Sequence, residues 1–183
     1  MSTEQSIAAA ESTLSKMKCF QLDECFNDRR LAEGCNSERQ CFVRRFPNRL
    51  KQEKDHIILP DLLGKDAPLL TTDFTIVDDH LSDIPEVNSG LIVIRSRNSK
   101  KPFTSKAASI NLARLKQKFL AWSETDWSGI YLEIDEEAVF LSQPKRVPEG
   151  RWISFDRTDF GETLTAELNQ LKVRADNPAL QND

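Results

Sequence analysis

The residues of this sequence that could do chemistry together are aspartates placed at the ends of apolar segments. Asp23 follows one such segment and Asp73 follows another. Because ligands bind outside the carboxyl ends of the strands in open α/β sheets, acids at these positions are candidates for a site. A solvated acidic face is the plainer interpretation of a run of acids. The candidate metal ligands are Asp23, Asp55, Asp73, Asp78 and Asp79.

Carboxylates that lie close together repel one another, and a divalent cation relieves that repulsion. Oxygen ligands without cysteine or histidine favour Mg²⁺ or Mn²⁺. Such an ion polarises a phosphoryl oxygen and activates a water, so the pattern indicates phosphodiester hydrolysis. Asp55 is also placed to cap a helix, and Asp78 and Asp79 cannot both face one site because adjacent helix positions diverge.

Two basic stretches flank the segment that carries Asp55, Asp73, Asp78 and Asp79. Residues 39–54 carry six bases against one acid, and residues 95–118 carry eight bases and no acid. A basic surface beside carboxylates suits an enzyme that acts on nucleic acid, although basic loops can also be merely solubilising. The candidates for nucleic-acid contacts are Arg44, Arg45, Arg49, Lys54, Arg97, Lys100 and Lys101.

The elements that must position these side chains alternate between strands and helices. Continuous apolar runs at 17–22, 40–45, 68–72 and 90–97 predict strands that are buried on both faces. Helical segments are expected from Asn27 or Asp28 to Gly34, from Asp55 to Gly64, over 74–81 and over 110–122. This alternation predicts an α/β protein with a mainly parallel central sheet.

The ends of the chain are less regular. A short helix is expected over 1–16, and residues 129–135 and 137–142 predict a hairpin. Pro144 and Pro148 indicate a domain edge, so we expect a main domain over 17–143. Residues 144–183 are expected to be a C-terminal extension with a strand near 151–155, a helix near 161–173 and a polar tail.

Composition bounds the class of protein. The chain has 183 residues, 30% of them charged, and a formal net charge of −4, which is ordinary for one globular domain. Its four cysteines match no zinc-binding spacing, and no secretory signal or membrane span is visible. We therefore expect a cytoplasmic protein with reduced thiols and no membrane partner.

Four blocks together resemble the PIN-like family of small Mg²⁺-dependent nuclease domains, in particular a compact branch related to the VapC-type toxins. They are Leu22-Asp23-Glu24-Cys25, Asp55-His56-Ile57-Ile58-Leu59, Leu70-Thr71-Thr72-Asp73-Phe74 and Gly90-Leu91-Ile92-Val93-Ile94. The resemblance covers residues 17–143 and rests on the order and spacing of the blocks.

The resemblance implies a three-layer α/β/α fold with extensions at both ends, and a ribonuclease that uses Mg²⁺ or Mn²⁺. It makes Asp23, Asp55 and Asp73 the catalytic acids and gives Thr71 and Glu24 supporting roles. Two positions depart from the family pattern: Thr75 replaces a second acid, and Cys25 replaces an asparagine. RNA, an antitoxin or other protein partner, and a second copy of the chain are the expected partners.

Three interpretations stay open at this point. The chain could be a metal-dependent ribonuclease, a PIN-like module that has lost catalysis and binds RNA or protein, or an α/β domain of the flavodoxin or receiver type. A receiver needs a lysine after a late strand, and the strand over 90–94 is followed by Arg95 instead.

Overall fold

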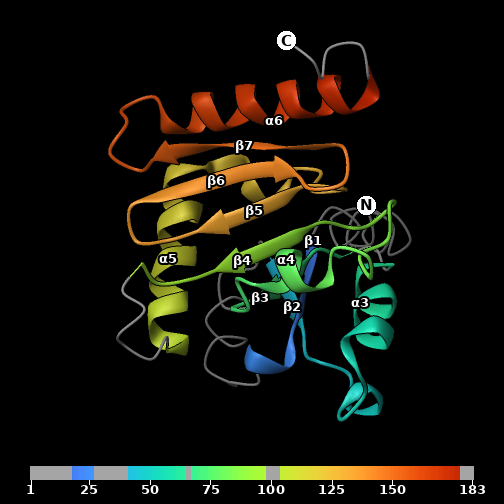
Figure 1. The fold of residues 1–183 in the computed structure, drawn as a ribbon. Helices are drawn as coiled ribbons and strands as arrows, with labels where there is room; N and C mark the ends of the chain where they lie inside the picture. The colour runs from blue at the N-terminus through green and yellow to red at the C-terminus, as the bar shows by residue number, and fades with distance from the viewer. Residues whose placement is uncertain (1–17, 27–40, 65–66, 98–103, 178–183) are drawn as a thin grey trace, which may run out of the picture.

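The apolar runs of the sequence assemble into one mixed sheet in the computed structural model, which describes residues 18–26, 41–64, 67–97 and 104–177 (Figure 1). These residues form a seven-stranded sheet in the order β2-β1-β3-β4-β5-β6-β7. The strands are β1 (Lys18–Leu22), β2 (Cys41–Arg44), β3 (Leu69–Thr71), β4 (Leu91–Ile94), β5 (Tyr131–Ile134), β6 (Ala138–Gln143) and β7 (Val147–Ser154). Strands β1 to β5 pair in parallel, whereas β6 and β7 are antiparallel. The predicted α/β class and the predicted hairpin are confirmed.

Helices cover both faces of the sheet. The α-helices are α3 (Asp55–Leu63), α4 (Ile76–His80), α5 (Ser105–Lys118) and α6 (Phe160–Asp176). Short 3₁₀ turns are η1 (Glu24–Phe26), η2 (Asn48–Leu50) and η3 (Leu120–Ser123). Helix α5 begins earlier than the expected start at residue 110, because the Thr104 hydroxyl caps it by accepting a hydrogen bond from the Ala107 N–H at 3.2 Å.

Two hydrophobic cores lie on the opposite faces of the sheet. On one face, α5 and α6 pack over β4 to β7 with the stacked rings of Phe20 and Trp122, whose centroids are 4.7 Å apart. On the other face, α3 and α4 pack over Leu69, Leu91 and Val93. Alternate residues of each central strand therefore enter different cores, which explains why these strands read as continuous apolar runs.

The segment after residue 143 belongs to the same sheet and the same core. Strand β7 pairs with β6, and α6 runs alongside β7 (Figure 1). Leu164, Leu168 and Leu171 of α6 are buried in the first core. The expected boundary at Pro144 therefore marks a turn between two paired strands and does not separate two folding units.

Some expectations fall outside the described residues: the helix over 1–16, the helix over 27–34, Lys100 and Lys101. None of the helices in the described ranges combines the length and apolar character that crossing a membrane requires.

A glycine at the start of β4 provides a test of the fold. Gly90 has φ +102°, and a Cβ there would lie 2.2 Å from the Trp127 carbonyl oxygen. We expect Gly90→Ala to lower the free energy of unfolding by about 2–5 kcal/mol, from backbone strain and overpacking together. Gly129, with φ +71° and open space around it, is the matched control. Gly129→Ala should lose only about 1–2 kcal/mol in chemical denaturation. Equal losses would show that the Trp127 contact is not tight.

Candidate metal centre

The sheet reverses its winding between β1 and β3. The chain passes from β1 to β2 on one side, and β3 then joins the other side of β1. In doubly wound sheets, ligands bind outside the carboxyl ends of the two strands that flank such a switch point. Leu22 and Leu70 are paired across these strands. Asp23 directly follows β1 and Asp73 lies two residues after β3, so both expected acids stand at this edge.

The side chain of Thr71 joins the two acids. Thr71 is fully buried, and its hydroxyl donates a hydrogen bond to Asp23 Oδ2 at 2.7 Å. The Thr71 hydroxyl oxygen also accepts a hydrogen bond from the backbone N–H of Asp73 at 3.0 Å. This one hydroxyl therefore fixes the Asp23 carboxylate and the backbone of Asp73 relative to each other.

The remaining contacts of the two acids come from neutral donors. Asp23 Oδ1 accepts from the Glu24 N–H at 2.7 Å, while the Glu24 side chain is exposed. Asp73 Oδ1 accepts from both the N–H and the hydroxyl of Thr75, each at 3.0 Å. Within the described ranges, neither carboxylate contacts a lysine, arginine or histidine side chain. The negative charge at this edge is therefore not offset by any cation of the described chain.

The thiol of Cys25 borders the same group. Its Sγ lies 3.6 Å from Asp23 Oδ2 and 3.7 Å from Thr71 Oγ1, and it accepts a hydrogen bond from the Thr72 N–H at 3.4 Å. Desolvation, and then the charge of Asp23, raise the pKa of the Cys25 thiol. Cys25 therefore stays protonated at neutral pH, as a weak donor to Asp23 rather than a nucleophile.

The other three candidate acids lie in different surroundings. Asp55 begins α3, and its Oδ2 is 3.2 Å from Nε2 of His80, whose Nδ1 is 3.2 Å from Asp83. Asp78 of α4 is close enough to Tyr131 for its charge to act on that phenol, and Asp79 is exposed. Across the described residues, no three carboxylate, histidine or cysteine side chains are arranged to hold one metal ion. The structure thus brings Asp23 and Asp73 to one edge but does not gather all five.

The expected nucleic-acid contacts differ in their surroundings. Arg45 and Lys54 are exposed, whereas Arg49 pairs with Asp61 at 2.7 Å. Arg44 is the last residue of β2, an edge strand of the sheet, and its carbonyl accepts a hydrogen bond from the Gln21 side chain at 3.4 Å. Arg97 forms ion pairs with Asp135 and Glu137, so its charge is already offset.

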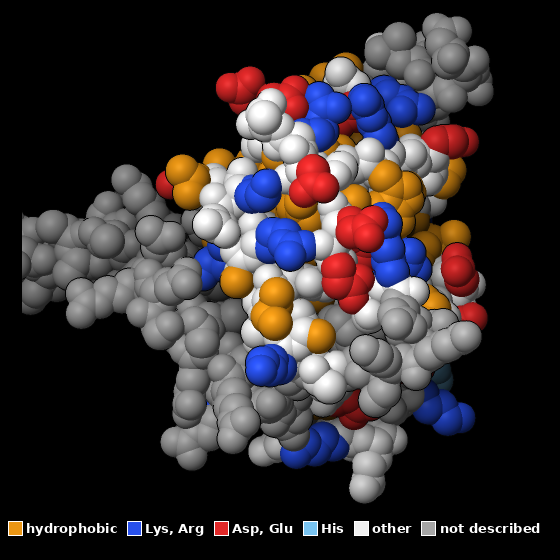
Figure 2. Space-filling model, turned by 90° about the vertical axis from the view of Figure 1, so that its left-hand side faces the viewer, with side chains coloured by type: hydrophobic (Ala, Val, Ile, Leu, Met, Phe, Trp, Pro, Cys, Tyr) orange, Lys and Arg blue, Asp and Glu red, His pale blue; other side chains and the backbone are white. Residues whose placement is uncertain are grey.

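Charged residues beyond the predicted set join the ends of β4 and β5. Arg95 pairs with Glu133, which also accepts a hydrogen bond from the Tyr131 hydroxyl at 2.9 Å. Asp135 is fully buried and accepts from two backbone N–H groups of the β5–β6 turn. Figure 2 views the side toward which the arrowheads of β4 and β5 point, and there acidic, basic and hydrophobic side chains intermingle. The sequence signal for these ion pairs was that one apolar run is followed by Arg95 and Arg97, whereas the next strand ends with Glu133 and Asp135.

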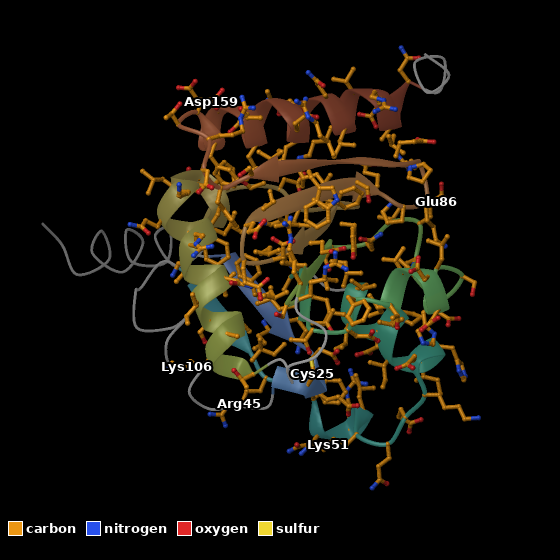
Figure 3. All side chains as sticks on the ribbon, turned by 60° about the vertical axis from the view of Figure 1, so that its left-hand side comes forward. Cys25, Arg45, Lys51, Glu86, Lys106 and Asp159 are labelled. Atoms are coloured by element: carbon orange, nitrogen blue, oxygen red, sulfur yellow. The ribbon has the colours of Figure 1, made fainter. Side chains whose placement is uncertain are left out.

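Exposed lysine and arginine side chains are present at the end of the molecule that carries Cys25. Figure 3 shows Arg45, Lys51 and Lys106 projecting at that end. All three are exposed. They come from the segments after β2, after η2 and in the first turn of α5, so bases from separate parts of the chain are available near the carboxyl edge.

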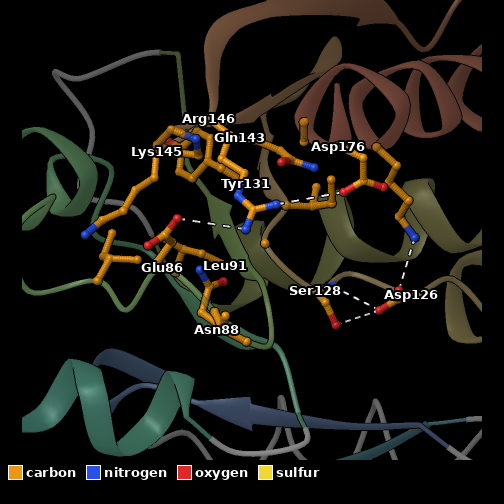
Figure 4. Close-up of a pocket in the computed structure, with 17 residues that line it drawn as sticks. Glu86, Asn88, Leu91, Asp126, Ser128, Tyr131, Gln143, Lys145, Arg146 and Asp176 are labelled. Atoms are coloured by element: carbon orange, nitrogen blue, oxygen red, sulfur yellow. Dashed lines mark hydrogen bonds and ion pairs between the residues drawn. The ribbon is translucent and has the colours of Figure 1, made fainter. Parts of the chain in front are cut away.

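A cavity of about 280 Å³ lies at the end of the sheet opposite to Asp23 and Asp73 (Figure 4). It is lined by the first residues of β4 and β5, Leu91 and Tyr131, and by the end of α6. Arg146 lies 3.9 Å from Glu86 and 3.9 Å from Asp176 there. The lining carries three basic side chains and three acidic ones, and it does not include Asp23, Thr71 or Asp73.

The role of Thr71 can be measured directly. We expect Thr71→Val to lower the free energy of unfolding by about 1–3 kcal/mol, because Asp23 loses a buried donor and the Asp73 N–H loses its acceptor. Thr71→Ser, which keeps the hydroxyl, is the control and should lose less. If valine and serine cost the same in chemical denaturation, the methyl group and not the hydroxyl stabilises this edge.

The state of Cys25 can be followed by alkylation with iodoacetamide and peptide mass spectrometry. A raised pKa leaves less thiolate at pH 8, so Cys25 should react more slowly in the folded protein than in the urea-unfolded chain. The rate should rise with pH beyond the ordinary range of cysteine. Asp23→Asn removes the neighbouring charge and should accelerate the reaction; an unchanged rate would show that Asp23 does not act on the thiol.

Comparison of the chain with protein-family models, with curated proteins and with solved structures gives no match to any of them. The function therefore has to be argued from the chemistry of the site itself.

Proposed function

We propose that the chain is a Mg²⁺- or Mn²⁺-dependent ribonuclease of PIN-like type. One observation carries the proposal: Asp23 and Asp73 stand at the switch point of the sheet, are linked through Thr71 and have no cationic partner within the described ranges. Structural carboxylates are usually neutralised by a neighbouring cation, whereas a pair left open at a ligand-binding edge suits a metal ion.

The donor set fits a hydrated hard cation better than a closed cage. Magnesium usually keeps several waters and is bound by one or two carboxylates together with substrate phosphates. Asp23 and Asp73 would hold the ion, which when bound would polarise the scissile phosphate and activate a water. Thr71 orients the Asp23 carboxylate, and Thr75 orients Asp73 through Oδ1. Asp73 Oδ2 has no partner among the described residues, so it is the oxygen available to an ion or a proton.

RNA as the substrate, and a role as the toxin of a toxin–antitoxin pair, come from the resemblance to PIN-like nucleases. The exposed Arg45, Lys51 and Lys106 support a polyanionic substrate, because lysine and arginine side chains near the candidate site attract phosphates. Phosphate contacts of this kind position a strand without reading its sequence.

A second candidate is a PIN-like module that binds RNA or a protein without cutting. The contact between Asp55 Oδ2 and His80 Nε2, at 3.2 Å, favours it, because this contact competes with metal binding by the third acid. The receiver alternative shares the strand order 2-1-3-4-5 with this sheet. However, β4 and β5 are followed by Arg95 and Asp135 instead of the lysine that a receiver requires.

Nuclease assays with purified protein test the proposal. Single-stranded RNA should be cleaved with Mn²⁺ or Mg²⁺ and not with EDTA. Asp23→Asn and Asp73→Asn should each lower the rate at least about 100-fold, because each removes a ligand charge. Asp61→Asn is the matched control, because Asp61 of α3 is paired with Arg49 of η2, and it should leave the rate unchanged.

Isothermal titration with Mn²⁺ separates the two candidates. Metal binding that requires Asp23 and Asp73, together with cleavage, supports the ribonuclease. RNA binding without metal binding or cleavage, unaffected by the two asparagine variants, supports the non-catalytic module and rules out the first proposal.

A further inference from the structure

Two exposed aromatic rings flank one guanidinium beside the candidate metal centre. Phe74 is 53% exposed and Trp152 is 42% exposed. The Cζ of Arg95 lies 6.0 Å from the Phe74 ring centroid and 5.7 Å from the Trp152 centroid. Arg97 Cζ is also 5.7 Å from the Trp152 centroid. We call these four residues, Phe74, Arg95, Arg97 and Trp152, the stacking platform.

The platform is assembled from three separate parts of the sheet. Phe74 follows β3, the arginines follow β4, and Trp152 belongs to β7. Trp152 pairs across the strands with Phe140 of β6, whose ring centroid is 5.3 Å away. Residues that follow one another along β6 and β7 point to opposite faces, and Val139, Leu141 and Ile153 enter the core beneath α5 and α6. Phe140 and Trp152 therefore lie on the face away from α6.

A glycine of β7 leaves room for the aromatic side chains on this face. Gly150 of β7 has no side chain, and a Cβ there would lie 2.1 Å from Cζ of the Phe140 ring. The glycine thus leaves room for Phe140 to lie against the strand. The core beneath α3 and α4 extends only to Tyr131 and a partly buried Phe140, so the described chain leaves Trp152 uncovered.

Ion pairs hold the two guanidinium groups in place. Glu133 holds Arg95 and is itself held by the Tyr131 hydroxyl, while Asp135 and Glu137 hold Arg97. Because these carboxylates offset the positive charge, the platform has little surplus attraction for phosphates. The platform offers planar groups instead: the Phe74 ring, the Arg95 guanidinium and the Trp152 ring.

We propose that the stacking platform binds the unpaired bases of a single-stranded RNA whose backbone passes the Asp23–Asp73 edge. This inference rests on the proposed function for the identity of the nucleic acid. Bases stack on aromatic side chains and on guanidinium planes, and they do so in single strands because pairing hides their faces. Phe74 directly follows Asp73, so a strand stacked on the platform lies next to the acids. The substrate class is therefore single-stranded RNA, whose bases the platform would hold by stacking.

Tryptophan fluorescence reports on the platform selectively. Of the three tryptophans, Trp122 and Trp127 are 1% exposed, and only Trp152 is open to solvent. The full chain carrying Asp23→Asn is titrated in EDTA with a single-stranded RNA oligonucleotide, so that binding is measured without metal or cleavage. The oligonucleotide should quench the emission, because its bases stack on the Trp152 ring. Heparin, which has charge but no bases, should not quench.

Substitutions complete the test. Trp152→Leu should weaken binding, followed by fluorescence anisotropy of a labelled RNA, by about 5- to 150-fold, and Phe74→Leu by a similar factor. Trp152→Tyr, which keeps a ring, should retain most of the affinity. Val173→Ala, which alters an exposed apolar side chain on α6, is the matched control and should change nothing.

Several outcomes would overturn the inference. They are unchanged RNA affinity in Trp152→Leu, equal quenching by heparin, and a concentration-dependent dimer that Trp152→Leu disrupts, because a second copy of the chain would then occupy the surface. The proposed function fails separately: RNA that quenches Trp152 but is never cleaved by the unmodified chain leaves the platform standing without the nuclease. Metal-dependent cleavage whose KM is unaffected by Trp152→Leu would support the nuclease and show that the platform does not bind its substrate.

Discussion

The hydrogen bond from the buried Thr71 hydroxyl to Asp23 is the contact on which the candidate site depends. It joins the ends of β1 and β3, which lie far apart in the sequence but are neighbours where the winding of the sheet reverses. Repulsion between nearby carboxylates would otherwise favour their separation. A neutral donor that is itself buried can hold one acid in place without cancelling its charge. The edge therefore keeps a negative charge that is available to an external cation.

At the ends of β4 and β5, the carboxylates are instead neutralised by arginine side chains. There Arg95 and Arg97 meet Glu133 and Asp135 across adjacent parallel strands, so the charges are satisfied inside the protein. Desolvation opposes ionisation of Glu136, but hydrogen bonds from Arg97 and Ser96 prevail and lower its pKa. The carboxyl edge of one sheet thus has an open acidic half and a neutralised half. Open acids suit metal chemistry, and neutralised arginines with their rings suit stacking.

Much of the fold could be predicted from residue patterns, because buried parallel strands such as 90–97 read as continuous apolar runs. The placement of Asp23 and Asp73 followed from the same rule, since both come directly after such runs. Contacts between distant segments could not be predicted in this way. His80 approaches Asp55 only because α4 packs beside α3, and Arg97 is engaged by Asp135 only because β4 and β5 are neighbours. Pro144 and Pro148 indicated a boundary, yet the hydrogen-bonded pairing of β6 with β7 carries the sheet past them.

The antiparallel strands change what the parallel part of the sheet can do. In a sheet that ended at β5, Glu133 and Tyr131 would lie at an edge exposed to water. Pairing with β6 and β7 buries them, which strengthens the ion pair of Arg95 by lowering the local dielectric constant. The same two strands bring Phe140 and Trp152 to the face that carries Phe74. Residues after 143 therefore contribute to the surface beside the candidate metal centre, and a fragment that stopped at residue 143 would keep Asp23 and Asp73 but lose the aromatic ring on which Arg97 rests.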